Sequence, residues 1–178
     1  MCQFNNIILP ANTNLDEVRS IFRQNKFNAS QFYNSSLSQQ LPDKIFLMSP
    51  KNQCDCGSVI SSARHQTTST FPTDKEVERL KLKGWSETKI KNHFANKQKA
   101  NSHKTDEIET ERANWSNLIK SIFASTKLNS FGILAHEYVG DISTEAITVK
   151  AKTKIKTAEF VPQQLENLLL DVYYEIQS

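Results

Sequence analysis

Hydrophobic and polar positions recur with two different periods along this chain, which predicts both strands and helices. Apolar runs at Phe4–Leu9 and Lys44–Met48 have the length of buried strands, and a proline closes each one. Between them, apolar residues recur every three or four positions over 14–24, which is the spacing of an amphipathic helix, and Thr13 is placed to cap it. We therefore expect the chain to open as strand, helix, strand.

Polar and charged residues begin to dominate at Pro72. Helices are predicted from Thr73 to about Lys83 and from Ser86 to about Lys97, with Gly84 as the break between them. After a polar link over 98–104, a third helix has one apolar face, made of Ile108, Trp115, Leu118, Ile119, Ile122 and Phe123. We expect residues 72–125 to form a helical insertion, with 1–71 and 126–178 as the core domain.

Three further apolar stretches follow the insertion. Phe131–Val139 and Ala146–Lys156 have the pattern of strands, and Gly140-Asp141 between them predicts a β-hairpin. Pro162 then opens a stretch with i, i+3, i+4 apolar spacing, which predicts a C-terminal core helix. The expected fold class is α+β: a single small mixed or antiparallel sheet, with the N- and C-terminal helices on one face and the helical insertion.

Composition narrows the class of protein without naming a reaction. The chain has 178 residues, of which 38% are hydrophobic and 23% charged, and these values are typical of a folded domain. Its apolar runs are far shorter than the ~20 residues that a membrane-spanning helix needs. We see no signal-peptide pattern, and the Asn- and Lys-rich, Gly-poor composition suggests a bacterial genome, so we expect a cytoplasmic bacterial protein with no membrane partner.

The most distinctive chemistry lies in Cys54-Asp55-Cys56-Gly57, directly after the second predicted strand. Clustered cysteines in a reducing compartment bind metals more often than they form disulfides. Zinc prefers four nitrogen or sulfur ligands, so Cys2, Cys54 and Cys56 need one histidine to complete a site. His136, on the predicted strand 131–139, is our first choice, and His65 is the alternative. Gly57 is expected to adopt a positive φ in the turn.

Two enzymatic interpretations of the same thiols stay open. Cys2 would become a nucleophile if removal of Met1 exposed an α-amino group to act as its base. Cys54 and Cys56 would form a strained, redox-active disulfide, although Asp55 between them repels the thiolate that such chemistry needs. The sequence has no phosphate-binding glycine loop and no Ser/His/Asp pattern, so we assign no catalytic or cofactor-binding residue.

Lysines are frequent in the insertion and in the row Lys150, Lys152, Lys154 and Lys156. Two helices joined at Gly84 have the outline of a helix-turn-helix, so nucleic-acid binding through the insertion is a further alternative. Lysines on amphipathic helices usually face water, and lysines on a strand commonly protect a sheet edge. We therefore favour a protein partner over nucleic acid for 72–125.

The opening Met1-Cys2-Gln3-Phe4, the strand-proline-helix pattern after it, and Cys54-Asp55-Cys56-Gly57 together resemble a group of small, uncharacterised bacterial proteins. These begin Met-Cys-x-Phe and carry Cys-Asp-Cys-Gly. The resemblance covers about the first third of the chain, brings no known activity, and implies that Cys2, Cys54 and Cys56 belong to one site. The sequence thus favours a zinc-stabilised binding or regulatory module, with a thiol-dependent enzyme or a nucleic-acid-binding protein as alternatives.

Overall fold

The computed structural model describes residues 2–50, 53–60 and 74–178, with the backbone alone at 100–104. The chain divides into two compact units, residues 1–64 with 111–178 and residues 65–110. The predicted insertion, 72–125, overlaps the second unit and extends into residues of the first.

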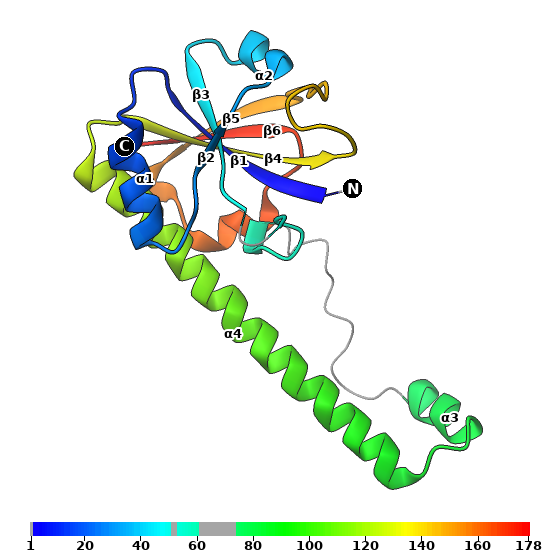
Figure 1. Ribbon diagram of the computed structural model, residues 1–178. Helices are drawn as coiled ribbons and strands as arrows, with labels where there is room; N and C mark the ends of the chain where they lie inside the picture. Colours follow the sequence, from blue (N-terminus) through cyan, green and yellow to red (C-terminus); the bar gives the residue numbers. More distant parts are fainter. Residues whose placement is uncertain (1, 51–52, 61–73) are drawn as a thin grey trace. The chain divides into compact units, whose positions relative to one another are not determined.

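The first unit is built on one six-stranded sheet with the order β2-β3-β1-β4-β6-β5 (Figure 1). The strands are β1 (Cys2–Pro10), β2 (Ser30–Phe32), β3 (Lys44–Met48), β4 (Ser130–Tyr138), β5 (Ala151–Lys156) and β6 (Val172–Gln177). In the centre, β1 and β4 run antiparallel, with Cys2 opposite Tyr138 and Ile8 opposite Gly132. Because β5 pairs parallel to β6 while the other pairs are antiparallel, the sheet is mixed, and the predicted α+β class is confirmed.

The sheet of the first unit is covered on both faces. On one face, Phe22 of α1 (Leu15–Gln24) packs on Phe131 of β4, with ring centroids 6.5 Å apart. Phe27 connects α1 to the last turns of α4 (Glu87–Ser125), since its ring lies 6.4 Å from Phe22 and 4.6 Å from Trp115. On the other face, α2 (Ser35–Gln40) and residues 139–150 cover a core that includes Ile8, Leu37, Leu134, Tyr138, Ile147 and Tyr173.

The second unit contains a helical hairpin of α3 (Asp74–Leu82) and the first turns of α4. Leu80, Ile90 and Phe94 form its small core, against which Val77 and Trp85 pack. The predicted break at Gly84 is confirmed: this glycine has φ 78°, a left-handed conformation that costs glycine little. Thr73, the predicted cap of this helix, lies outside the described residues.

The helices differ from prediction in three places. The polar link expected over 98–104 is wrong, because α4 is one continuous helix of 39 residues. No glycine or proline occurs between Trp85 and Phe131, and the Lys, Gln and Ala residues of the expected link favour helix, so nothing ends it there. Asn14, not Thr13, caps α1 by accepting from the N–H groups of Asp16 and Glu17. The short helix α2 was not predicted.

The C-terminal third departs most from the prediction. β4 and β5 do not form a hairpin, because β6 lies between them and pairs with both. The predicted C-terminal helix is also wrong, since Pro162–Asn167 is a 3₁₀ helix and Val172–Gln177 is strand β6. The apolar spacing fits a helix, but Val172-Tyr173-Tyr174 are residue types that favour strands, and pairing with two neighbours decides in favour of the sheet.

Candidate metal centre

The Cys54–Gly57 loop lies along the part of β1 that β3 leaves unpaired. β3 pairs with β1 only over Asn6–Pro10. Further toward the start of β1, the loop takes over this edge: the Asp55 N–H donates to the carbonyl of Gln3 (2.8 Å), and the Gln3 N–H donates to Cys56 Sγ (3.3 Å). The N–H of Asn5 donates to the Asp55 carboxylate (2.8 Å). Because buried N–H groups need acceptors, these bonds hold the loop against the strand.

This arrangement brings the three cysteines together. The Sγ atoms of Cys2, Cys54 and Cys56 all lie within 4.8 Å of one another, and none is in a disulfide. Cys2 is exposed, whereas Cys54 and Cys56 are half-buried. Four thiolates around a tetrahedral zinc at about 2.3 Å would be about 3.8 Å apart, so modest side-chain rotation would bring these sulfurs onto one ion. The cluster can therefore hold a metal ion.

Buried polar groups support the loop behind the thiols. Asp55 and Ser58 are each 2% exposed, and Asn5 is fully buried, with its side-chain amide donating to Ser58 Oγ (3.1 Å). The next residue, Val59, donates its N–H to the carboxylate of Glu111 on α4 (3.1 Å). The loop is thus tied to both β1 and α4. N–H groups that donate to a metal-binding sulfur or to its neighbours commonly orient such ligands.

Gly57 does not play the role that the sequence suggested. Its φ is not positive, and a Cβ added there would meet no atom within 4 Å. The turn therefore does not require glycine at this position.

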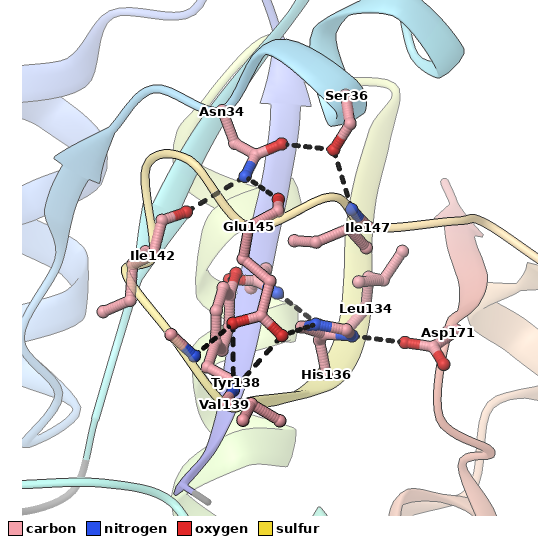
Figure 2. Close-up of polar contacts among 12 residues, drawn as sticks. Asn34, Ser36, Leu134, His136, Tyr138, Val139, Ile142, Glu145, Ile147 and Asp171 are labelled. Carbon is pink, nitrogen blue, oxygen red and sulfur yellow. Dashed lines mark hydrogen bonds and ion pairs between the residues drawn. The ribbon is translucent and has the colours of Figure 1, made fainter.

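The histidines proposed as the fourth ligand are placed as follows. His136 lies opposite Phe4 in the sheet and is not among the residues gathered at the thiols. Its Nδ1 is 2.5 Å from the Asp171 carboxylate and its Nε2 is 3.5 Å from that of Glu145 (Figure 2). His65 lies outside the described residues. The identity of the fourth ligand stays a prediction.

His136, Glu145 and Asp171 form a charged cluster that the sequence analysis did not identify. Glu145 also accepts hydrogen bonds from the N–H groups of Val139 (2.9 Å) and Gly140 (2.7 Å), and Asp171 accepts one from Lys150 Nζ (2.7 Å). Since the two carboxylates contact opposite nitrogens of the ring, the three side chains do not converge on one point as metal ligands would. They instead join β4 to the segments that follow β4 and precede β6.

Both carboxylates of this cluster have lowered pKa values. Hydrogen bonds from the backbone of Gly140 and Val139 and from His136 lower the pKa of Glu145, against the opposing effect of desolvation. Burial alone would raise the pKa of Asp171, but the hydrogen bonds from Lys150 and His136 outweigh it, so its pKa lies below the ordinary 3.8. The folded state therefore favours the ionised forms.

The segment that follows β4, residues 139–150, is also held by the start of α2. The side-chain amide of Asn34 donates to the carbonyls of Ile142 (3.0 Å) and Glu145 (2.9 Å), and Ser36 Oγ accepts from the N–H of Ile147 (2.8 Å), as Figure 2 shows. These bonds explain how a long irregular segment covers the sheet without pairing as a strand.

No protein-family model matches the chain, and no curated protein or solved structure is significantly similar to it. Within the described residues, no helix has both the length and the apolar character needed to cross a membrane. Evidence about function therefore comes from the site itself.

Proposed function

We propose that this protein is a binding or regulatory module whose first unit is stabilised by zinc bound to Cys2, Cys54 and Cys56. The observation that supports this most directly is that the sulfur of Cys2 on β1 lies close to the two sulfurs of a loop that is hydrogen-bonded to this strand. Zinc is the metal proposed because thiolates bind it well and it brings no redox chemistry.

A structural role is proposed because the ligands come from two segments far apart in sequence. Cys2 belongs to β1 and the other two cysteines to the loop, so a bound ion would crosslink strand and loop. Such a site barely exists in the unfolded chain, and the free energy of metal binding then adds to the free energy of folding. A fourth ligand would close the site; for His136 to supply it, the ring would first have to leave one of its two carboxylates, and His65 is the alternative.

The test is the metal content of protein purified without a histidine tag, measured with the number of reactive thiols before and after chelation. We expect about one zinc per chain, and three thiols that react slowly until a chelator is added. Cys54→Ser and Cys56→Ser should each lose the metal. Gln53→Ser, an exposed change beside the loop that leaves every sulfur in place, is the matched control and should keep it.

His136→Ala and His65→Ala identify the fourth ligand, because the variant that lacks it should bind zinc more weakly at unchanged thiol count. A metal-free protein in which one thiol reacts fast in the native state would overturn the zinc proposal. It would instead support the thiol-dependent enzyme, with the fast cysteine as the candidate nucleophile.

A further inference from the structure

The sheet of the first unit has one long open edge, which is formed by strand β5. β5 pairs with β6 alone and ends the strand order, so its other side has no neighbouring strand among the described residues. Because the N–H and C=O groups of successive residues in a strand point to opposite sides, every second residue of Ala151–Lys156 directs both groups away from β6. Five of these six residues are exposed, and Ile155 is half-buried. At the other end of the sheet β2 has only three residues, so β5 is the longer surface on which a further strand can form.

A row of lysines follows this open side of β5, named here the β5 edge. Lys152, Lys154 and Lys156 occupy alternate positions, so their side chains lie on the same face of the strand, with Cα atoms about 6.6 Å apart. A strand added at the β5 edge would place its own side chains opposite these lysines at the same two-residue spacing. A second copy of β5 would bring lysines against lysines, which is repulsive, whereas alternating carboxylates would attract them.

The positive charge of this row is only partly balanced. Lys154 Nζ lies 3.9 Å from the carboxylate of Glu175, which is closer to Lys44 Nζ (3.3 Å). Lys152 Nζ donates to a neutral backbone carbonyl (2.9 Å), and Lys156 has no ion-pair partner in the part of the chain that the structure describes. The three lysines of the row and Lys44 thus share one carboxylate, four positive charges against one negative, which leaves a net charge of +3.

Two features favour an extended peptide over nucleic acid as the partner of this charge. Backbone donors and acceptors both occur along the β5 edge, and a second strand offers both in return, whereas a phosphate backbone offers acceptors alone. The strand also has no aromatic ring on which a base can stack, since Ala151–Lys156 contains only Ala, Lys, Thr and Ile.

We propose that the β5 edge binds an extended segment of a partner protein in which acidic residues alternate with small or β-branched ones. The segment adds a strand to the sheet, its backbone pairs with the outward groups of β5, and its carboxylates lie opposite Lys152, Lys154 and Lys156. This inference rests on the binding role proposed above and supplies its partner, and none of its residues is a proposed metal ligand. Metal content and peptide binding, measured on the same samples, therefore separate a failure of the zinc proposal from a failure of this one.

The experiment is a fluorescence-anisotropy titration of the full chain against the labelled peptide Thr-Glu-Val-Glu-Thr-Glu-Val-Glu. We expect saturable binding at about 0.1 M salt, where charges are screened over about 10 Å. Lys154→Gln/Lys156→Gln should weaken binding about two- to fivefold per lysine, the range for cross-strand ion pairs. The matched control Lys120→Gln/Lys127→Gln removes two exposed lysines of the first unit that lie outside β5, and it should bind like the parent.

Two further peptides and a second measurement separate strand pairing from attraction between charges. A peptide of the same sequence with methylated backbone nitrogens keeps every carboxylate but cannot donate to a strand, so it should not bind. A peptide of the same composition with its glutamates in one block should bind more weakly, because they no longer match the two-residue spacing. In amide hydrogen exchange, the alternate N–H groups of Ala151–Lys156 that face away from β6 should become protected by the peptide, while those of β2 should not change.

Several outcomes would overturn the proposal. They are an absence of binding at about 0.1 M salt, equal losses in the β5 variant and its control, or protection at β2 in place of β5. Equal binding of the methylated peptide would show that charge alone is responsible. A single-stranded DNA oligonucleotide that displaces the peptide and binds more tightly would assign the lysines to nucleic acid, and a dimer of the free protein that the peptide dissociates would assign the β5 edge to a second copy of the chain.

Discussion

Removing the carboxylate of Asp55 is the clearest single test of how the Cys54–Gly57 loop is held in place. Asp55 is 2% exposed and accepts the N–H of Asn5, which is itself fully buried at the start of β1. Asp55→Ala removes that acceptor and leaves a backbone donor without its partner in a site closed to water. Asp55→Asn removes the charge and replaces one oxygen by an NH2 group but keeps an oxygen that can accept the Asn5 N–H, so it is the matched control.

The size of the effect follows from the burial of the donor. A buried donor left without an acceptor costs about 1–3 kcal/mol, and bonds to charged groups lie in the upper half of that range, so we expect Asp55→Ala to lower the free energy of unfolding by about 2–3 kcal/mol. For a chain of this size that corresponds to a fall in melting temperature of roughly 4–12 °C. Asp55→Asn should cost about 1 kcal/mol or less, because the hydrogen bond persists in a weaker, uncharged form.

The assay is urea unfolding of Trp85→Phe protein, in which Trp115 is the remaining fluorophore and lies 1% exposed in the first unit. Measurements in the presence of a chelator isolate the hydrogen bond from any metal. Zinc affinity, measured separately, should fall about 10–100-fold in Asp55→Ala, the usual range for groups that orient metal ligands. If chelated Asp55→Ala were within 0.5 kcal/mol of the parent, or no less stable than Asp55→Asn, the loop would not depend on this bond and the argument would fail.

Two further predictions concern the sheet. Glu145 and Asp171 have lowered pKa values in the folded state, so their contribution to stability is complete above their ordinary values of 4.5 and 3.8 and is lost as the pH falls through the lower folded values. Urea midpoints between pH 2 and pH 6 should therefore drop on the acid side, and less so in Lys150→Gln, which removes a hydrogen bond to Asp171; identical profiles would contradict this. Gly132→Ala should destabilise the protein by about 1–3 kcal/mol in thermal unfolding, since its Cβ would lie 2.4 Å from Tyr173 Cε2 and 3.0 Å from the carbonyl oxygen of Ile8. A variant as stable as the parent would show that the tyrosine ring can move aside.

The first half of the fold could be predicted because its signals are local. A proline closes the run Phe4–Leu9, Gly84 breaks a helix, and amphipathic spacing marks α1, and each of these acts within one element. The position of β6 could not be predicted in this way. Its apolar spacing satisfies a helical template, and the burial that makes it a strand comes from β4 and β5, which the sequence places far from it.

In the candidate site too, only the residues with a local signal in the sequence could be predicted. Two cysteines one residue apart could be found from the sequence. Cys2 was placed beside them on the assumption that the three cysteines form one site. The supporting residues Asn5, Ser58 and Glu111 carry no local signal, because their role exists only once the loop lies against β1 and α4. His136 was noticed for its chemistry, but its partners were expected elsewhere: Glu145 in the connection of a hairpin and Asp171 in a C-terminal helix.

The unpaired edge of β1 explains why thiols would be useful at this place. β3 stops pairing at Asn6, so at Gln3 and Asn5 the loop replaces a regular ladder, and one of the hydrogen bonds that it makes to the strand ends on sulfur. A regular strand would have continued the ladder and closed the edge by itself. A metal ion shared by Cys2 and the loop would supply the missing crosslink at the end of the strand, where fraying begins. Loss of zinc should therefore expose the first residues of β1 to amide hydrogen exchange before it affects the paired part from Asn6 onward.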